Sequence, residues 1–214
     1  MSCFSILNLL LLTNVRLFGY MKSKISLQFK QLGSSTWKDF VELFGKRGAC
    51  GGCWCMAWRQ SSAEYAKNKG ENNKRAMKKL VGKYEQLGII AYHDGKPIGW
   101  CAVSPRENYS KLESSRVLKR IDDEPVWSIP CFFLAKEYRR KGLSTEILKG
   151  VIAYCKKKNV RILEAYPIIP YSENMPASFA WTGMLSTFLK AGFVEEKRWS
   201  KSRPIVRYYL KLKL

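Results

Sequence analysis

The 214-residue chain is short of acidic residues and has a single histidine. It contains 17 Asp and Glu against 38 Lys and Arg, so its formal net charge is +21. Such an excess of positive charge attracts polyanions, among them nucleic acid, anionic lipid and phosphate-rich cofactors. Charge alone does not choose among these partners.

A hydrophobic run long enough to cross a membrane is absent. The apolar stretch 4–12 is too short, because a spanning helix needs about 20 apolar residues. No Lys or Arg precedes this stretch and no small-residue cleavage site follows it, unlike in a signal peptide. The pattern changes near Met21, so we predict that residues 1–20 are an extension, of the kind that an early start codon introduces, and that one domain spans 21–214. No membrane association is expected.

Disulfide and zinc frameworks are also missing. The seven cysteines are odd in number, and Cys50, Cys53 and Cys55 crowd into six residues. That usage favours a reducing, cytoplasmic location. A structural zinc site wants four ligands, and no second cysteine pair follows the cluster. We therefore predict no metal, and take the cluster as a tight turn that buries small thiols, with a reactive thiolate near Arg59 as the alternative.

The sequence motifs of known phosphate-binding loops are absent too, but one segment offers an anion the same kind of helix start. An apolar run at 126–134 predicts a buried strand, and the basic turn 139–144 then opens a helix. Unpaired N–H groups at a helix start bind anions, and Gly142 lets the backbone approach closely. The turn lacks the Gly-Lys-Ser/Thr ending of a Walker loop and the three glycines of a dinucleotide loop. A basic helix start on the surface is the alternative reading.

Apolar periodicity predicts strands and helices that alternate within one mixed α/β domain. Pro130 lies inside the central strand and predicts a bulge there. Residues 62–87 indicate one or two basic helices, and 107–120 a polar helix or loop. The strands are expected at 25–29, 88–93, 97–103, 126–134, 160–166, 193–199 and 205–212, and the other helices at 35–44, 142–158 and 179–190.

This order of elements resembles the GNAT acyltransferase superfamily. The pyrophosphate loop of that family reads Gln/Arg-x-x-Gly-x-Gly/Ala, and the matching positions here are Arg139, Gly142 and Ser144. The resemblance covers roughly 22–214. Four further segments resemble a mostly uncharacterised bacterial and archaeal subgroup: Gly-Cys-Trp-Cys-Met-Ala-Trp-Arg (52–59), Gly-Trp-Cys-Ala-Val-Ser-Pro-Arg (99–106), Pro-Val-Trp-Ser-Ile-Pro-Cys-Phe-Phe (125–133) and Glu-Ala-Tyr-Pro (164–167).

The resemblance implies a mixed, mostly antiparallel central sheet with helices on both faces and splayed central strands. It implies acetyl-CoA as the acyl donor, with the pantetheine arm paired to the backbone at 132–134 and the pyrophosphate on N–H groups of 140–145. The cofactor-binding residues so expected are Phe132, Phe133, Leu134, Arg139, Arg140, Lys141, Gly142, Leu143, Ser144 and Thr145.

The resemblance also assigns catalytic roles. Glu164 matches the strand carboxylate of the family and is expected to take a proton from the incoming ammonium, while the Leu134 N–H steadies the oxyanion. The alternative for Glu164 is a surface or hairpin-paired carboxylate. Phe188 stands where the family usually has a tyrosine that acts as the general acid, and a phenylalanine cannot donate a proton. Tyr166 is the substitute that we predict for this proton donor, and Tyr171 is a second candidate.

The resemblance places part of the wall of the acceptor site at the cysteine cluster. Arg59 and Arg106 each end an apolar segment, where a cation could meet an acidic acceptor or the cofactor phosphates. The expected function is acetyl transfer to an amine of a small molecule or a protein, by a monomer or homodimer. The alternatives are an RNA- or ribosome-associated binding protein, disfavoured because the charges are spread along the chain, and a non-catalytic acyl-CoA sensor. The substrate-binding residues so predicted are Cys53, Trp54, Cys55, Arg59 and Arg106.

Overall fold

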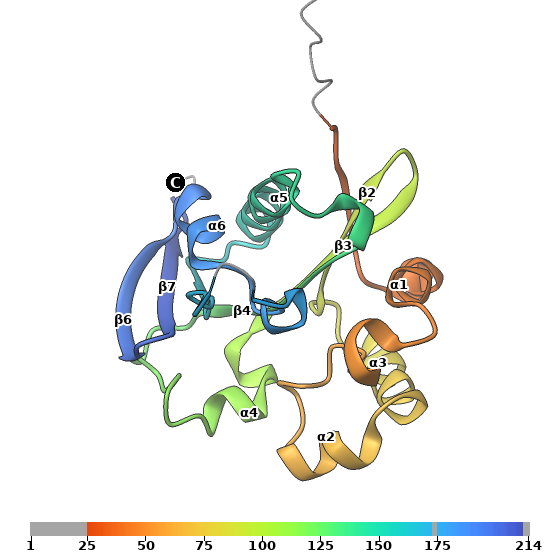
Figure 1. The fold of residues 1–214 in the computed structure, drawn as a ribbon, viewed down its shortest axis with the longest axis horizontal. Coiled ribbons are helices and arrows are strands. Elements are labelled where there is room, and N and C mark those ends of the chain that lie inside the picture. The colour runs from red at the N-terminus through yellow and green to blue at the C-terminus, as the bar shows by residue number, and fades with distance from the viewer. Residues whose placement is uncertain (1–24, 173–174, 212–214) are drawn as a thin grey trace, which may run out of the picture.

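The computed structural model describes residues 25–172 and 175–211, which form a single sheet flanked by helices (Figure 1). The sheet has the strand order β1-β2-β3-β4-β5-β7-β6. Every neighbouring pair is antiparallel except β4 and β5, which are parallel. The expected mixed, mostly antiparallel sheet is therefore confirmed. Its strands are β1 Gln28–Gln31, β2 Gly88–His93, β3 Lys96–Pro105, β4 Trp127–Leu134, β5 Ile162–Ala165, β6 Val194–Ser200 and β7 Arg203–Tyr209.

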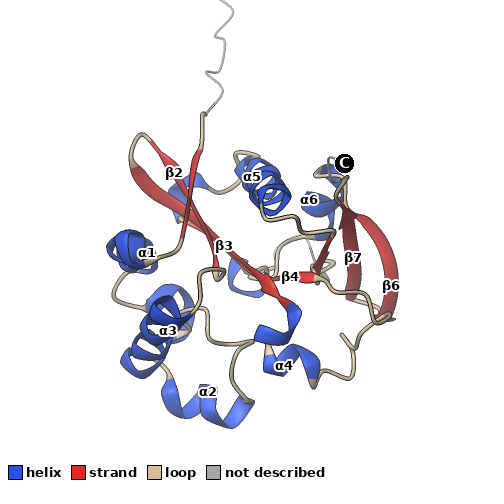
Figure 2. Cartoon of the chain, turned by 180° about the vertical axis from the view of Figure 1, so that it is seen from behind, coloured by secondary structure: helices blue, strands red, loops and turns tan. Residues whose placement is uncertain are grey.

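Helices lie on both faces of the sheet, and Figure 2 shows the same layers from behind. Strand β3 divides its side chains between the faces, because successive residues of a strand point in opposite directions. Cys101 and Val103 join the core beneath α5 and α6, whereas Trp100 and Ala102 join the core beneath α1 and α3. The helices are α1 Trp37–Phe44, α2 Ser62–Asn68, α3 Glu71–Lys83, α4 Ser110–Glu113, α5 Leu143–Lys157 and α6 Leu185–Lys190.

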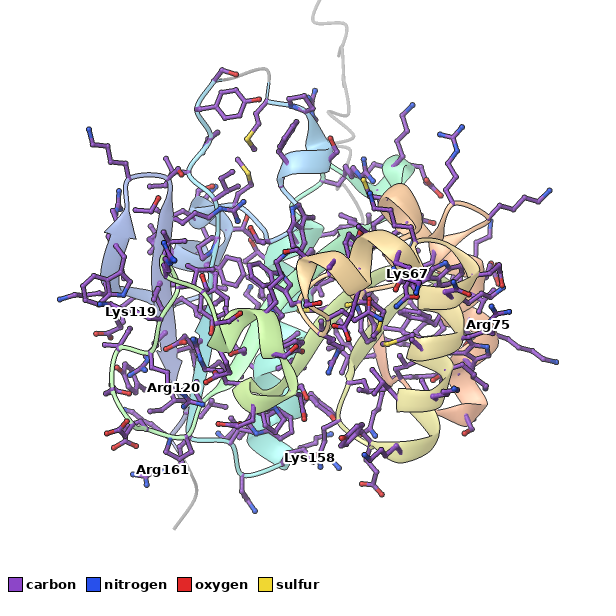
Figure 3. All side chains as sticks on the ribbon, turned by 90° about the horizontal axis from the view of Figure 1, so that it is seen from below. Lys67, Arg75, Lys119, Arg120, Lys158 and Arg161 are labelled. Atoms are coloured by element: carbon purple, nitrogen blue, oxygen red, sulfur yellow. The ribbon has the colours of Figure 1, made fainter. Side chains whose placement is uncertain are left out.

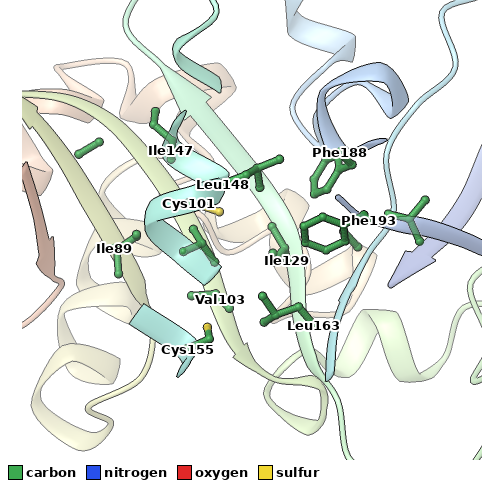
Figure 4. Packing of buried hydrophobic residues seen from close by; sticks show 14 of the residues in the cluster. Ile89, Cys101, Val103, Ile129, Ile147, Leu148, Cys155, Leu163, Phe188 and Phe193 are labelled. Carbon is green, nitrogen blue, oxygen red and sulfur yellow. The ribbon is translucent and has the colours of Figure 1, made fainter. Parts of the chain in front are cut away.

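The core beneath α5 is a cluster of buried apolar side chains. Ile147, Leu148 and Val151 of α5 are fully buried and meet Val103 and Ile129 of the sheet (Figure 4). Burial of apolar surface at about 25 cal/mol per Å² is the main free energy that holds the helix on the sheet. Helix α5 is thereby fixed as a rigid element, and its first turn points toward the end of β4.

The central strands part where the sequence predicts a bulge. Strands β4 and β5 pair only from Trp127↔Leu163 to Ile129↔Ala165. On the other side of β4, two residues, Ile129 and Pro130, lie opposite the single residue Val103, so the predicted irregularity at Pro130 is confirmed. Proline has no N–H to donate, which helps to end the β4–β5 pairing here. Beyond it, the Phe132 N–H donates to the Trp181 carbonyl at 2.7 Å instead of to β5.

Two sequence predictions need correction and a third is confirmed. The helix expected at 179–190 is α6 alone, preceded by a turn in which Gly183 has φ +82° and lies against the Phe188 ring. The one or two helices predicted within 62–87 are two, α2 and α3, parted at Gly70, which also has positive φ. The first strand begins at Gln28 rather than residue 25. The predicted extension, residues 1–20, lies outside the described residues and stays a prediction.

Within residues 25–172 and 175–211, no helix is long and apolar enough to cross a bilayer.

Candidate active site

The turn between β4 and α5 presents backbone N–H groups at a helix start. Gly142 has φ +77° and precedes α5, and no side chain caps the helix. The first N–H groups of such a helix lack intrahelical partners and carry partial positive charge. Arg140 also has positive φ (+59°), a backbone strain that is often found at binding loops. The local sequence thus builds an anion cradle, and the one carboxylate of the first turn, Glu146, pairs with Lys149.

A cavity of about 320 Å³ extends from this turn along β4, and we call it the loop cavity. Phe132, Phe133 and Leu134 form its β4 wall, and Arg139, Arg140 and Ser144 lie at its turn end. The Arg139 side chain is held in place because its Nε donates to the Leu134 carbonyl at 2.8 Å. The opposite wall comes from the segment 178–184 and from α6 rather than from β5. Six of the ten residues predicted to bind the cofactor therefore line one cavity.

The other four predicted cofactor residues support the turn without lining the cavity. Leu143 is buried in the core beneath α5, and the Thr145 N–H closes the turn onto the Gly142 carbonyl at 3.2 Å. Lys141 is exposed, with its ammonium 5.6 Å from the Tyr138 ring centre. Their contribution to an anion is through backbone N–H groups and long-range charge.

The edge of β4 that faces the loop cavity has a regular hydrogen-bonding pattern. The Ala135 N–H donates to the Ile98 carbonyl on the β3 side. Alternate residues of a strand point their N–H groups to opposite sides, so Phe132 and Leu134 both direct theirs away from β3. The Phe132 N–H already donates to the Trp181 carbonyl. The Leu134 N–H is therefore the donor at the mouth of the turn, as the predicted oxyanion role requires.

A second cavity, of about 270 Å³, lies on the α1–α3 face of the sheet. Four cysteines line it, Cys50, Cys53, Cys55 and Cys131, and we call it the thiol cavity. The remaining lining is mostly aromatic, with Trp58, Tyr65 and Trp181 among it, and Lys111 is its one charged lining residue. The two cavities share Phe132 and Phe133 of β4 together with Cys50 and Trp181. A group held in one can therefore lie close to a group held in the other.

Trp58 and Trp181 shape the boundary between the two cavities. Their rings stack with centroids 5.4 Å apart, and the Trp58 indole N–H donates to the Pro130 carbonyl at 2.9 Å. The sequence analysis did not name these two tryptophans as site residues, because tryptophans on apolar faces usually pack in the core. Cys131 was missed for the same reason, since it lies inside the apolar run of β4. Trp58, Trp181 and Cys131 all lie close to the proline bulge of β4. There the Pro130 carbonyl accepts from the Trp58 side chain, and the Phe132 N–H donates to the Trp181 carbonyl.

The predicted acceptor residues separate into two groups. Cys53 and Cys55 line the thiol cavity. Trp54 does not, because its ring is buried among Phe40, Phe44 and the Lys74 ammonium. Arg59 does not line the cavity either: it stacks on the Tyr109 ring and donates to the Asn108 carbonyl. The structure thus places Trp54 in the core, as a correction to the predicted substrate role.

Arg106, Glu164 and Tyr166 form a buried cluster away from both cavities. The Glu164 carboxylate is fully buried and accepts from Arg106 at 2.8 Å and from Arg207 at 2.8 Å. Tyr166 donates to it at 2.7 Å. Burial and the Glu164 charge raise the pKa of Tyr166 well above its usual range.

This cluster does not match the catalytic and substrate roles predicted for its members. A general base must reach the amine directly or through one water. Glu164 lines neither cavity, and both its oxygens already accept charged hydrogen bonds. Tyr166 and Arg106 are enclosed with it. Glu164 is a structural, paired carboxylate, but it is buried against Arg106 and Arg207 rather than lying at the surface or in a hairpin, as the stated alternative had it. The base is left unassigned.

Phe188 lies where the family pattern has an acidic tyrosine. Its ring is fully buried, lines the loop cavity and packs edge-on against Phe193 at 5.1 Å. It contributes an apolar wall and no proton. Among the described residues, no group of three or more His, Cys, Asp or Glu side chains is arranged to hold a metal ion.

Comparison with known proteins follows the same outline. The family model of the acetyltransferase (GNAT) family matches residues 54–177, which is more than half of the 214-residue chain. The chain belongs to this family. The resemblance drawn from the Arg139–Ser144 turn is thereby confirmed at the family level. No curated protein sequence matches the chain.

Solved structures share the fold at low sequence identity. One is the PaiA N-acetyltransferase of Thermoplasma acidophilum in complex with coenzyme A, with 17% identity over 87% of this chain and 100% of that chain, and a TM-score of 0.50. Another is a GNAT-family acetyltransferase of Streptococcus agalactiae, with 13% identity over 88% and 99% of the two chains and a TM-score of 0.52. They support the GNAT-like fold, and family membership supports an acyl-CoA-dependent transferase.

Proposed function

We propose that the protein is an acetyl-CoA-dependent N-acetyltransferase. The observation that carries the proposal is the pair of cavities that share the Phe132–Phe133 wall, one of which ends at the uncapped start of α5. The loop cavity fits a coenzyme A thioester, because it joins an anion cradle to a strand edge. The thiol cavity then holds the amine that receives the acyl group.

Each part of the loop cavity has a physical task in this reaction. N–H groups after Gly142 and the charge of Arg140 hold the pyrophosphate. The Leu134 N–H would steady the carbonyl oxygen as negative charge develops there. Bound acetyl-CoA supplies the activated acyl group, and the apolar wall of Leu148 and Phe188 keeps water from it. Phe188 leaves the departing thiolate to the positive field of the turn and to solvent.

The lining of the thiol cavity suggests the class of amine. Aromatic rings and thiols dominate it, and no Asp or Glu is among its lining residues. A polyamine would bury charges there without carboxylate partners, which costs several kcal/mol per charge. We therefore propose a compact aromatic or apolar primary amine, whose acidic group, where it has one, pairs with Lys111.

Dedicated RNA binding is the second function to weigh. Figure 3 shows labelled basic residues on different parts of the molecule, from Lys67 of α2 and Arg75 of α3 to Lys158 and Arg161. A nucleic-acid groove would gather such charges with exposed aromatic rings on one face. The spread favours the transferase, and strong salt-dependent retention on RNA would instead favour the alternative.

Calorimetric titration with acetyl-CoA tests the donor site. Gly142→Glu should abolish binding, because it places a carboxylate where the pyrophosphate would lie. Gly95→Glu is a matched control, since Gly95 also has positive φ (+76°) and free space around its Cβ but lies on the β2–β3 hairpin. Unchanged affinity in Gly142→Glu would refute the assignment of the turn.

Acetyl transfer is tested by chromatography of released coenzyme A in the presence of phenylethylamine, tyramine, spermidine and a lysine peptide. We expect the two aromatic amines to be acetylated fastest. Turnover of spermidine alone would contradict the proposed acceptor class but leave the donor site intact.

A further inference from the structure

The thiol cavity contains a polar arrangement that is not used by the donor site. Cys55 and Cys131 come from the cysteine cluster and from β4, and both line this cavity. The Trp100 indole N–H donates to the Cys55 Sγ at 3.2 Å. Cys131 directly precedes Phe132, which belongs to the wall shared with the loop cavity. The Cys55 sulfur is thus hydrogen-bonded on the core side and faces the acceptor space on the other.

The surroundings stabilise a negative charge on this sulfur. The neighbouring Cys131 thiol is the largest influence, and together with the Arg59 charge and the Trp100 N–H it outweighs burial and lowers the pKa of Cys55. The pKa of Cys131 is raised, first by its hydrogen bond with Cys55 and then by burial. Arg59 has a buried Nε without a hydrogen-bond partner, so part of its charge remains uncompensated.

Other titratable groups near Cys55 do not offer an alternative base. Burial raises the pKa of Cys53 and, to about 12, that of Tyr65. Burial likewise raises the pKa values of Tyr109 and Cys101. Lys111 is a cation in the same lining. The titratable and charged groups around Cys55 on its own face of the sheet are Cys50, Cys53, Arg59, Tyr65, Tyr109, Lys111 and Cys131.

We infer that Cys55 is a thiolate that takes the proton from the acceptor amine, with Cys131 and Trp100 as its positioning residues. The inference rests on the proposed N-acetyltransferase function and assigns the base that the geometry of Glu164 leaves open. The Cys55 sulfur lies on the acceptor side of the shared wall, whereas Glu164 is enclosed elsewhere.

The proton and electron balance of the step is simple. The ammonium form of the acceptor gives one proton to the Cys55 thiolate and becomes a neutral amine. Its lone pair forms the C–N bond to the acetyl carbon, and the C–S bond of acetyl-CoA breaks with its electron pair on sulfur. The amine proton lost on amide formation neutralises that leaving thiolate. The Cys55 thiol then returns its proton to solvent, so no other reactant is needed.

Alkylation by iodoacetamide tests the thiolate without any acceptor. At pH 7 we expect Cys55 to be carboxamidomethylated about tenfold faster than Cys53, which lines the same cavity, as read by peptide mass spectrometry. Arg59→Gln and Cys131→Ala should each slow Cys55 and leave Cys53 unchanged. Equal rates at Cys53 and Cys55 in the wild-type protein would overturn the proposal, whether or not the protein acetylates a given amine.

The role in catalysis is tested with phenylethylamine as the acceptor. Cys55→Ala should lower turnover by about 10²–10⁴-fold and remove the acid limb of the pH profile, with acetyl-CoA affinity by calorimetry unchanged. Cys155→Ala, in the core beneath α5, is the control and should keep the wild-type profile. A wild-type profile in Cys55→Ala would overturn the base role. So would an acetyl adduct on Cys55 after incubation with acetyl-CoA alone, because Cys55 would then be the nucleophile.

Failure of this inference is distinguishable from failure of the proposed function. Acetyl-CoA binding that depends on Gly142 supports the donor site irrespective of Cys55. If that binding is absent while Cys55 is still the fastest thiol, the thiolate stands and the transferase assignment falls, and with it the base role.

Discussion

The carboxylate of Glu164 and the sulfur of Cys55 are both almost completely buried, yet their surroundings prepare them for different tasks. Glu164 is closed in by Arg106, Arg207 and Tyr166, and every oxygen has its charged or hydroxyl partner. Cys55 has donors on one side and a cavity of about 270 Å³ on the other. Burial alone does not mark a catalytic group; an open side toward a substrate does.

The two regions also differ in how they hold the sheet together. The ion-pair network of Arg106, Glu113, Asp122, Glu164 and Arg207 ties β5 and β7 to the loops that follow β3 and α4. Arg106 additionally donates to the Leu118 carbonyl at 2.7 Å. The thiol cavity is bounded by segments that pack through apolar contacts. Removing a charge from the network should therefore damage the fold far more than removing a sulfur from the cavity.

Glu164→Gln should have the largest effect on stability. It leaves two buried guanidinium groups short of a negative partner, and breaking such a pair costs about 3–5 kcal/mol of unfolding free energy. Denaturant unfolding of the variant measures this loss. The control is Glu195→Gln in the exposed pair with Arg198, where a change within about 1 kcal/mol is expected. Full stability with a large loss of turnover in Glu164→Gln would restore the carboxylate to the catalytic role first predicted.

Cys55→Ala should cost much less stability than Glu164→Gln. The change deletes one heavy atom beside existing space, so we expect a loss of about 1 kcal/mol in the same unfolding assay. Its effect should instead appear in turnover. A loss of stability as large as that of Glu164→Gln would mean that the thiol is part of the core and not of an open site.

Asp122→Asn should have the smallest effect, and one that depends on pH. A hydrogen bond from Arg207, opposed by burial, lowers the pKa of Asp122 in the folded protein. A depressed folded pKa contributes stability that is present above the unfolded value, about 3.9, and is lost as pH falls through the folded pKa. The wild-type protein should thus lose stability on acidification below about pH 4 more steeply than Asp122→Asn does.

Unfolding free energies measured between pH 2 and 6, a range of about four units around the unfolded Asp pKa, check this slope. Asp123→Asn, the next residue of the same exposed loop, is the matched control and should follow the wild-type slope. The side chain of Asp122 is 40% exposed, so solvent screening keeps its share of the stability small. Parallel slopes in wild type and Asp122→Asn would mean that the ion pair between Asp122 and Arg207 contributes nothing to the free energy of unfolding.

The sequence predicted the donor site better than the acceptor site. The turn 139–144 is a local object: a buried strand, a glycine with positive φ and a helix start lie in one short segment. Three of its predicted residues and three predicted residues of β4 line the loop cavity. The thiol cavity needs Cys55, Cys131 and Trp181, which are far apart along the chain. No local pattern reports their meeting, and apolar surroundings made each resemble core.

By itself, the sequence determined the alternating strands and helices of a mixed α/β domain, the proline bulge of β4 and the anion cradle before α5, because periodicity, proline chemistry and helix termini act over a few residues. The tertiary structure decided which polar groups remain open. Strand β7 brings Arg207 onto Glu164 and closes it, whereas Trp181 stacks on Trp58 and borders a cavity around Cys55. The residues that pair with a polar group, or leave one side of it open, come from distant parts of the chain. Only the folded structure sets the distances between them.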